Sequence, residues 1–229
     1  NVSLASCQTV LDPEKPVDLI LVTAPSDEEQ ALAREQGVEL VLAPFCYDAF
    51  VFLVNAENPV DSLTAQQIRD IYAGRILDWG LVGGTAGLPL EAFQRPKNSG
   101  SQTAMEQLVM RGQTMFAAQD NYISDGMGDL VRQVGNFDSG QRALGYSYLY
   151  YVTGLYKSGG IKVLSVDGIA PARENLVSGL YPFTVSYYAV YLKGNQTAER
   201  FVEWLQGSEG QKAVRQAGYI PLVEVGETP

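Results

Sequence analysis

Short apolar runs alternate along the chain with segments whose apolar residues recur at helical spacing. The apolar runs predict strands at 17–23, 38–45, 48–59, 91–95, 143–152, 161–171 and 181–194. The periodic segments predict helices at 26–37, 62–74, 101–112, 127–136 and 197–218, the last as one helix or two. The first run, VDLILVT, is interpreted as a buried parallel strand. Such alternation is typical of an α/β fold, so we expect a mostly parallel sheet.

End signals support two of the predicted helices. Ser26 can cap the first helix, and Gly37 closes it. In the second, Thr64 and Gln67 have the spacing of a capping box, and Gly74 stands where a C-cap glycine belongs. These local signals predict where both helices begin and end.

Two long apolar segments suggest a division into two lobes. The extended segments at 48–55 and 183–192 bracket a self-contained α/β stretch, and we expect them to be crossover strands. The predicted first lobe is discontinuous and contains residues 1–52 and 187–229, and the second contains residues 53–186.

Composition and charge narrow the classes of function. The chain has 229 residues and a formal net charge of −10, which argues against nucleic acid as a partner because no basic patch can neutralise phosphates. A small anion remains compatible, since local hydrogen-bond donors make such a site. There is no histidine, which removes histidine-based nucleophile systems and imidazole metal ligands. We expect no enzyme activity, metal or cofactor, and no apolar run reaches membrane-spanning length.

Cysteine usage leaves two interpretations open. Cys7 and Cys46 lie far apart in sequence and cannot form a zinc site alone. They are either two small apolar side chains or, in a secreted protein, a disulfide. The tetrapeptide LASC around Cys7 resembles a lipobox, but only three residues precede it, so it does not qualify as a signal.

The stretch RPKNSGSQT, which begins at Arg95, carries the candidate binding chemistry. Ser99 and Gln102 have the spacing of a helix start, where the first N–H groups lack internal partners. An oxyanion there could accept from the N–H groups of Gly100, Ser101 and Gln102. Arg95 could add a bidentate guanidinium. The alternative is an ordinary capped helix beside two solvated cations.

Three stretches taken together resemble a known family. PVDSLTAQQIRDIYAGRILDWGLVGG is followed by FQRPKNSGSQTAMEQLVM and then by ALGYSYLYYV. In this order they resemble the phosphate-binding proteins of bacterial ABC-type phosphate uptake systems, and more closely a related group of cell-surface domains from Gram-positive bacteria. The similarity runs from about Asp18 to Leu222. It implies a two-lobed α/β fold of the periplasmic-binding-protein-like type II family, with two crossover strands and an anion in the cleft.

The resemblance also implies which residues hold the anion. Its arginine and S-G-T/S turn match Arg95, Ser99, Gly100 and Ser101, and its first-lobe serine or aspartate matches Thr23. Some relatives carry aspartate where this chain has Thr23, so an acceptor for a phosphate proton is missing. Discrimination of phosphate from sulfate is therefore in doubt.

Other residues receive weaker predictions. Asp48 opens the first crossover strand and could orient Arg95 or accept from a ligand hydroxyl, although such an aspartate more often caps a turn. The family normally has a strand, turn and helix before NVSLASC, so we expect an incomplete first lobe that self-associates or rearranges. Aromatic residues are expected in packing or hinge roles, namely Tyr146, Tyr148, Tyr150 and Tyr151, and in the core, namely Trp79 and Trp204.

The resemblance predicts an extracellular solute-binding protein that captures an inorganic oxyanion, with phosphate first, for an ABC transporter. Its expected partners are phosphate or a similar oxyanion and a transporter permease or other cell-surface protein. The resemblance further predicts attachment to the cell membrane, as in a Gram-positive lipoprotein whose signal segment lies outside this chain. The alternative is a cell-surface sensing or interaction domain that has kept the fold and lost tight anion binding.

Overall fold

The structure of the protein is a computed structural model. The structure describes residues 17–25, 27–97, 99–118, 122–135, 140–155 and 159–223. The chain forms two compact units. Unit 1 contains Asn1–Asp48 and Val185–Pro229, and unit 2 contains Ala49–Thr184.

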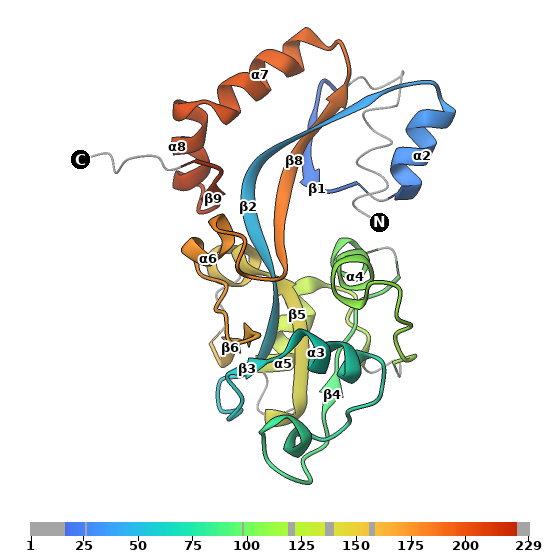
Figure 1. The fold of residues 1–229 in the computed structure, drawn as a ribbon, viewed down its shortest axis with the longest axis vertical. Coiled ribbons are helices and arrows are strands. Elements are labelled where there is room, and N and C mark those ends of the chain that lie inside the picture. Colours follow the sequence, from blue (N-terminus) through green and yellow to red (C-terminus); the bar gives the residue numbers. More distant parts are fainter. Residues whose placement is uncertain are drawn as a thin grey trace, which may run out of the picture. The chain divides into compact units, whose positions relative to one another are not determined.

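The sheet of unit 1 is built from strands that come from both ends of the chain. The strand order is β1–β8–β2, where the strands span Ile20–Thr23, Thr184–Leu192 and Leu40–Asn55 (Figure 1). β1 pairs antiparallel with β8, and the short strand β9, Ile220–Pro221, pairs antiparallel with β2. Because β8 lies between β1 and β2, the β1–helix–β2 unit does not form an adjacent parallel pair.

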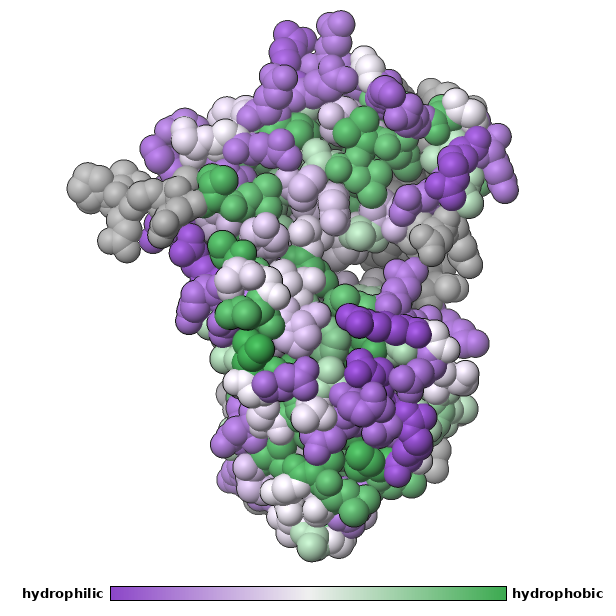
Figure 2. Space-filling view, in the orientation of Figure 1, coloured by the Kyte–Doolittle hydropathy of each residue, from purple (hydrophilic) through white to green (hydrophobic). Residues whose placement is uncertain are grey.

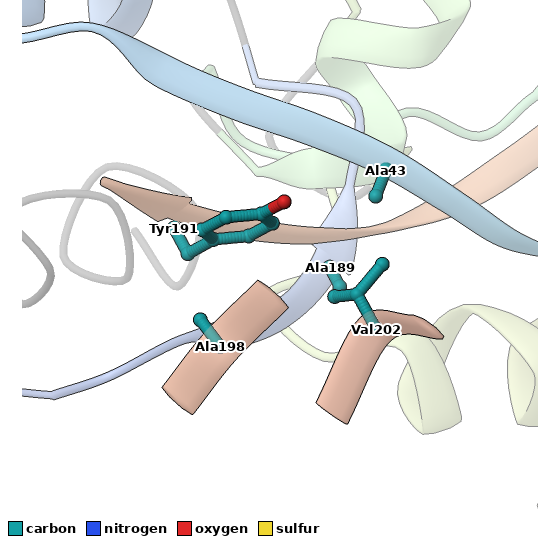
Figure 3. Packing of buried hydrophobic residues seen from close by; sticks show 5 residues of the cluster. All are labelled: Ala43, Ala189, Tyr191, Ala198 and Val202. Carbon is teal, nitrogen blue, oxygen red and sulfur yellow. The ribbon is translucent and has the colours of Figure 1, made fainter. Parts of the chain in front are cut away.

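Helices α2, α7 and α8 complete unit 1 and span Asp27–Glu35, Gln196–Gln206 and Ser208–Gln216. Asn195 caps α7 by accepting from the N–H groups of Thr197 and Ala198, each at 3.1 Å. The apolar face of α7 packs on the sheet in a cluster shown in Figure 3, formed by Ala43, Ala189, Tyr191, Ala198 and Val202. Trp204 falls outside this face and is 48% exposed, so its predicted core position is wrong.

The sheet of unit 2 is centred on the second part of β2. This part pairs antiparallel with β5, Ala143–Tyr148, and with β6, Ile161–Val163. β4, Glu91–Ala92, pairs parallel with β5. A separate parallel pair joins β3, Ser62–Leu63, to β7, Ser165–Val166.

The prediction of a mostly parallel sheet is wrong for the described pairings. The antiparallel pairs are β1–β8, β2–β5, β2–β6 and β2–β9. The described parallel pairs are short: β3–β7 joins two strands of two residues each, and β4–β5 involves the two-residue strand β4. Helical segments separate most consecutive strands, yet consecutive strands are rarely neighbours in a sheet. The first run is also only half buried, not a buried parallel strand.

Helices surround the sheet of unit 2. They comprise α3 (Ala65–Tyr72), α4 (Gly100–Ala104), the π-helix η2 (Met105–Met110), α5 (Met127–Gly135) and α6 (Arg173–Val177). Shorter 3₁₀ and π turns lie at Trp79–Val82, Gly140–Arg142 and Tyr151–Leu155. The predicted capping box of α3 is confirmed, with Thr64 and Gln67 bonded reciprocally at 3.0 and 2.8 Å. Gly74 has a φ of 74°, as its predicted C-terminal position requires.

Aromatic side chains dominate the core of unit 2. Fully buried rings pack edge to face or tilted against one another, and they belong to Phe50, Phe52, Tyr72, Tyr146 and Phe183. Figure 2 shows polar side chains over much of the visible surface, with apolar ones between them. Large apolar side chains that reach the surface include Leu21, Leu77, Leu81, Leu155, Leu180 and Trp204.

Candidate anion-binding site

The first turn of α4 presents unused backbone donors. Ser99 caps the helix, and its hydroxyl accepts from the N–H of Gln102 at 3.3 Å, which confirms the predicted helix start. The helical segment continues without a break from α4 into η2, so its N-terminal N–H groups carry the positive end of a dipole. No group in the described part of the chain accepts from the N–H of Gly100 or Ser101. Two donors are therefore available at this turn.

The side chain of Ser101 adds a third donor at the same turn. Ser101 is only 3% exposed, and its hydroxyl has no hydrogen-bond partner among the described residues. Burying a hydroxyl without a partner is unfavourable, and such groups are uncommon in folded proteins. The orphan hydroxyl beside two free N–H groups indicates a place for a ligand acceptor.

Arg95 lies just after β4 and brings a positive charge to this part of unit 2. One terminal nitrogen of its guanidinium donates to the carbonyl oxygen of Ser124 at 2.6 Å. Its Nε is buried and has no hydrogen-bond partner in the described part of the chain. Burial lowers the pKa of Arg95, while the nearby Asp125 and Asp129 act in the opposite direction. Arginine nevertheless remains charged in proteins, so Nε is a charged donor without an acceptor.

The side chain of Gln102 is directed into the protein and is fully used there. Its amide oxygen accepts from the hydroxyl of Tyr146 and from the backbone N–H of Arg95, the latter at 3.3 Å. Its amide nitrogen donates to Glu106 at 2.9 Å and to the Met115 sulfur at 3.5 Å. These four bonds use the whole hydrogen-bonding capacity of a glutamine. The backbone N–H of Gln102, which was the predicted anion donor, donates to the Ser99 hydroxyl at 3.3 Å, and the role of Gln102 in ligand binding stays a prediction.

Two tyrosines of β5 tie the site together, which sequence reasoning missed. The hydroxyl of Tyr146 accepts from the N–H of Arg95 at 2.9 Å, and the hydroxyl of Tyr148 donates to the carbonyl of Gly100 at 3.3 Å. Burial is the main cause that raises the pKa of Tyr146, so its phenol stays protonated and able to donate. The alternating tyrosines in ALGYSYLYYV suggested packing, and nothing local to that strand indicates their partners.

The remaining predicted site residues, Thr23 and Asp48, belong to unit 1. Thr23 ends β1 opposite Tyr187 of β8, and Asp48 lies buried in β2 on the other side of β8. Burial raises the pKa of Cys46 to about 12, and the charge of Asp48 adds to this rise. The roles of Thr23 and Asp48 in ligand binding stay predictions.

Several other expectations concern groups elsewhere in the chain. Cys46 is a buried free thiol, whereas Cys7, the LASC tetrapeptide and Ser26 lie outside the described residues. Over the part of the chain that the structure describes, no cluster of three or more histidine, cysteine, aspartate or glutamate side chains could hold a metal ion. Among the described helices, none combines the length and apolar character needed to cross a membrane.

Comparison with known proteins identifies the family. A model described as the PBP superfamily domain matches residues 7–209. The chain belongs to this superfamily. The predicted periplasmic-binding-protein-like α/β fold and the family resemblance are thereby confirmed.

Relatives of this PBP superfamily chain include phosphate-binding proteins. It is 27% identical to the phosphate-binding protein PstS of Bacillus subtilis over 178 residues, which cover 76% of this chain and 55% of that protein. It is 26% identical to the PstS of Pseudomonas aeruginosa over 215 residues, covering 85% of this chain and 64% of that protein. The chain thus spans less than two thirds of the length of these relatives.

Solved structures share the same fold. A substrate-binding protein from Clostridium perfringens with bound phosphate superposes with a TM-score of 0.74 and 25% identity, covering 96% of this chain and 84% of that chain. An ABC-type phosphate transport receptor from Vibrio cholerae gives a TM-score of 0.71 at 19% identity, with 95% and 84% covered. The fold of the PBP superfamily therefore extends over nearly the whole chain.

Proposed function

We propose that this PBP superfamily chain is an extracytoplasmic solute-binding protein that captures an inorganic oxyanion, with phosphate as the first candidate, for an ABC transporter. The observation that carries the proposal is the buried hydroxyl of Ser101, which has no partner among the described residues and stands on the turn with two free N–H groups. The names of the relatives, which are phosphate-binding proteins, support phosphate as the anion.

The chemistry of the site in unit 2 suits a tetrahedral oxyanion. The free N–H groups of Gly100 and Ser101 and the Ser101 hydroxyl are neutral donors on one turn of helix. Arg95 adds a charged donor through its Nε. All of these groups can donate hydrogen bonds to an anion, and no base among the described residues is hydrogen-bonded to the Ser101 hydroxyl, so the proposed role is capture without turnover.

Thr23 and Asp48, which belong to unit 1, are further proposed ligand residues. Because the unit 2 groups named above are all donors, they do not by themselves favour a protonated oxyanion over sulfate. The carboxylate of Asp48 is a candidate acceptor for a phosphate proton.

A calorimetric titration with phosphate, sulfate and molybdate tests the proposal, using the parent chain and Arg95→Ala. Hydrogen bonds to charged groups contribute about 1.5–3 kcal/mol, so Arg95→Ala should weaken phosphate binding by roughly one to two decades. Phosphate binding by Arg95→Ala as tight as that of the parent would remove Arg95 from the site. A parent chain that binds none of the three anions would overturn the proposed function.

A sensing or interaction domain is the second candidate function. The observation that favours it is an exposed aromatic pair on α7, in which the rings of Phe201 and Trp204 lie 5.6 Å apart. Such a pair on the surface is typical of contacts with another protein. Loss of anion binding in the titration, together with association in light scattering that Trp204→Ser abolishes, would support this candidate over the first.

The proposed location and partners follow from the proposed function. We propose that the protein acts outside the cytoplasm, held at the cell membrane as a lipoprotein of a Gram-positive organism, and delivers its anion to a transporter permease. Fractionation of the source cells, followed by release of the protein with a lipase or with detergent, tests membrane attachment. Light scattering of the purified chain tests the predicted self-association.

A further inference from the structure

The hydrogen bonds around Gln102 have directions that the chemistry of the end groups determines. At one end is the backbone N–H of Arg95, which can only donate, 2.9 Å from the Tyr146 hydroxyl and 3.3 Å from the Gln102 amide oxygen. At the other end is the carboxylate of Glu106, which accepts from the Gln102 amide nitrogen at 2.9 Å. The Gln102 amide therefore has one orientation, and Tyr146 must donate its proton to the amide oxygen.

This chain of bonds connects the two parts of the proposed anion site. Gln102 belongs to the first turn of α4, which carries the proposed anion donors Gly100 and Ser101, and Arg95 belongs to the loop after β4. Gln102 is 4% exposed, so a lost hydrogen bond there would not be replaced by water at little cost. Glu106, which is exposed, lies at the outer end of the network.

We propose that Glu106 is a positioning residue of the anion site. It acts through Gln102 and Tyr146 to hold the loop of Arg95 and the first turn of α4 in the geometry that binds the anion. This inference rests on the proposed function, because it assigns a role in the same site. Glu106 itself touches no ligand.

The sign of the expected effect separates positioning from simple electrostatics. Glu106 is an anionic side chain four residues after Gln102, so its charge opposes the binding of another anion at the first turn of α4. If charge alone mattered, removal of Glu106 would tighten phosphate binding. If Glu106 positions Gln102, its removal weakens binding despite the lost repulsion.

Three variants test this by phosphate titration. Glu106→Leu, which loses the acceptor, should bind phosphate roughly tenfold more weakly, the equivalent of about one lost hydrogen bond. Glu106→Gln keeps an oxygen acceptor for Gln102 and should bind within about twofold of the parent or more tightly. Glu57→Leu removes the same charge from an exposed turn just after β2 and serves as the control with unchanged affinity.

Amide hydrogen exchange without phosphate tests the network independently of binding. The Arg95 N–H should exchange several-fold faster in Glu106→Leu than in the parent, and Glu106→Gln should restore the slow rate. The inference is overturned if Glu106→Leu binds phosphate as tightly as or more tightly than the parent, or if Arg95 exchange is unchanged. Those results leave the proposed function standing, whereas a parent chain that binds no anion overturns both.

Discussion

Replacing Ser101 by alanine should have opposite effects on stability and on anion binding. In the free protein the Ser101 hydroxyl is buried at 3% exposure without a partner among the described residues. An unsatisfied buried polar group costs about 1–3 kcal/mol. Alanine removes that group, so the free energy of unfolding of the free protein should rise on this order. The melting temperature should rise by about 2–4 °C for each kcal/mol gained.

Phosphate binding should change in the other direction. In the proposed complex the Ser101 hydroxyl donates to a charged oxygen, an interaction of about 1.5–3 kcal/mol. Loss of this interaction should raise the dissociation constant for phosphate by roughly 10- to 150-fold. Thermal unfolding without phosphate and calorimetric titration with phosphate measure the two effects on the same variant.

Ser147 provides a matched control in the same unit. It lies in β5, is fully buried, and its hydroxyl likewise has no partner among the described residues. Ser147→Ala should therefore stabilise the free protein to a similar degree and leave phosphate affinity unchanged. If Ser101→Ala lowers the melting temperature, or binds phosphate as well as Ser147→Ala does, the Ser101 hydroxyl is not a ligand-binding group.

Three further predictions concern the fold. Thr64→Ala breaks the capping box of α3 and should lower the free energy of unfolding, measured by urea denaturation, by about 0.5–2 kcal/mol, whereas Thr64→Ser should restore it. Gly145→Ala should destabilise the protein more than Thr64→Ala does, because the new Cβ would lie 2.6 Å from a methyl carbon of Leu130. An unchanged urea midpoint for Gly145→Ala would contradict this packing. Burial raises the pKa of Cys46 from 9.0 to about 12. The contribution of the protonated thiol to folding stability is therefore complete below pH 9 and is lost as the pH rises toward 12. The free energy of unfolding of Cys46→Ala should fall less steeply than that of the parent across this window.

Local sequence determined the helices and the start of the candidate site. The capping box at Thr64, the glycine after α3 and the cap at Ser99 were all predictable, because each depends on groups within a few residues of one another. The same holds for the free N–H groups at Gly100 and Ser101, since every helix leaves its first donors unused.

Strand order was decided only in the tertiary structure. The apolar run of β1 could pair with β2, the next strand in sequence, yet it pairs with β8, so that Ile20 lies opposite Val190. No local pattern encodes which of several apolar strands inserts between β1 and β2, and the prediction of a mostly parallel sheet was wrong for that reason. Trp204 was misplaced similarly, because only packing decides which stripe of α7 faces the sheet.

The completion of the candidate site also depended on tertiary contacts. The Tyr146 hydroxyl meets Gln102 and Arg95 across 44 and 51 residues of sequence, so the sequence alone could not show that Gln102 is saturated by protein groups. For the same reason the missing partner of the Ser101 hydroxyl became visible only after folding. Residue types and helix starts are local properties, whereas whether a buried donor is satisfied depends on every group that the fold brings within hydrogen-bond distance.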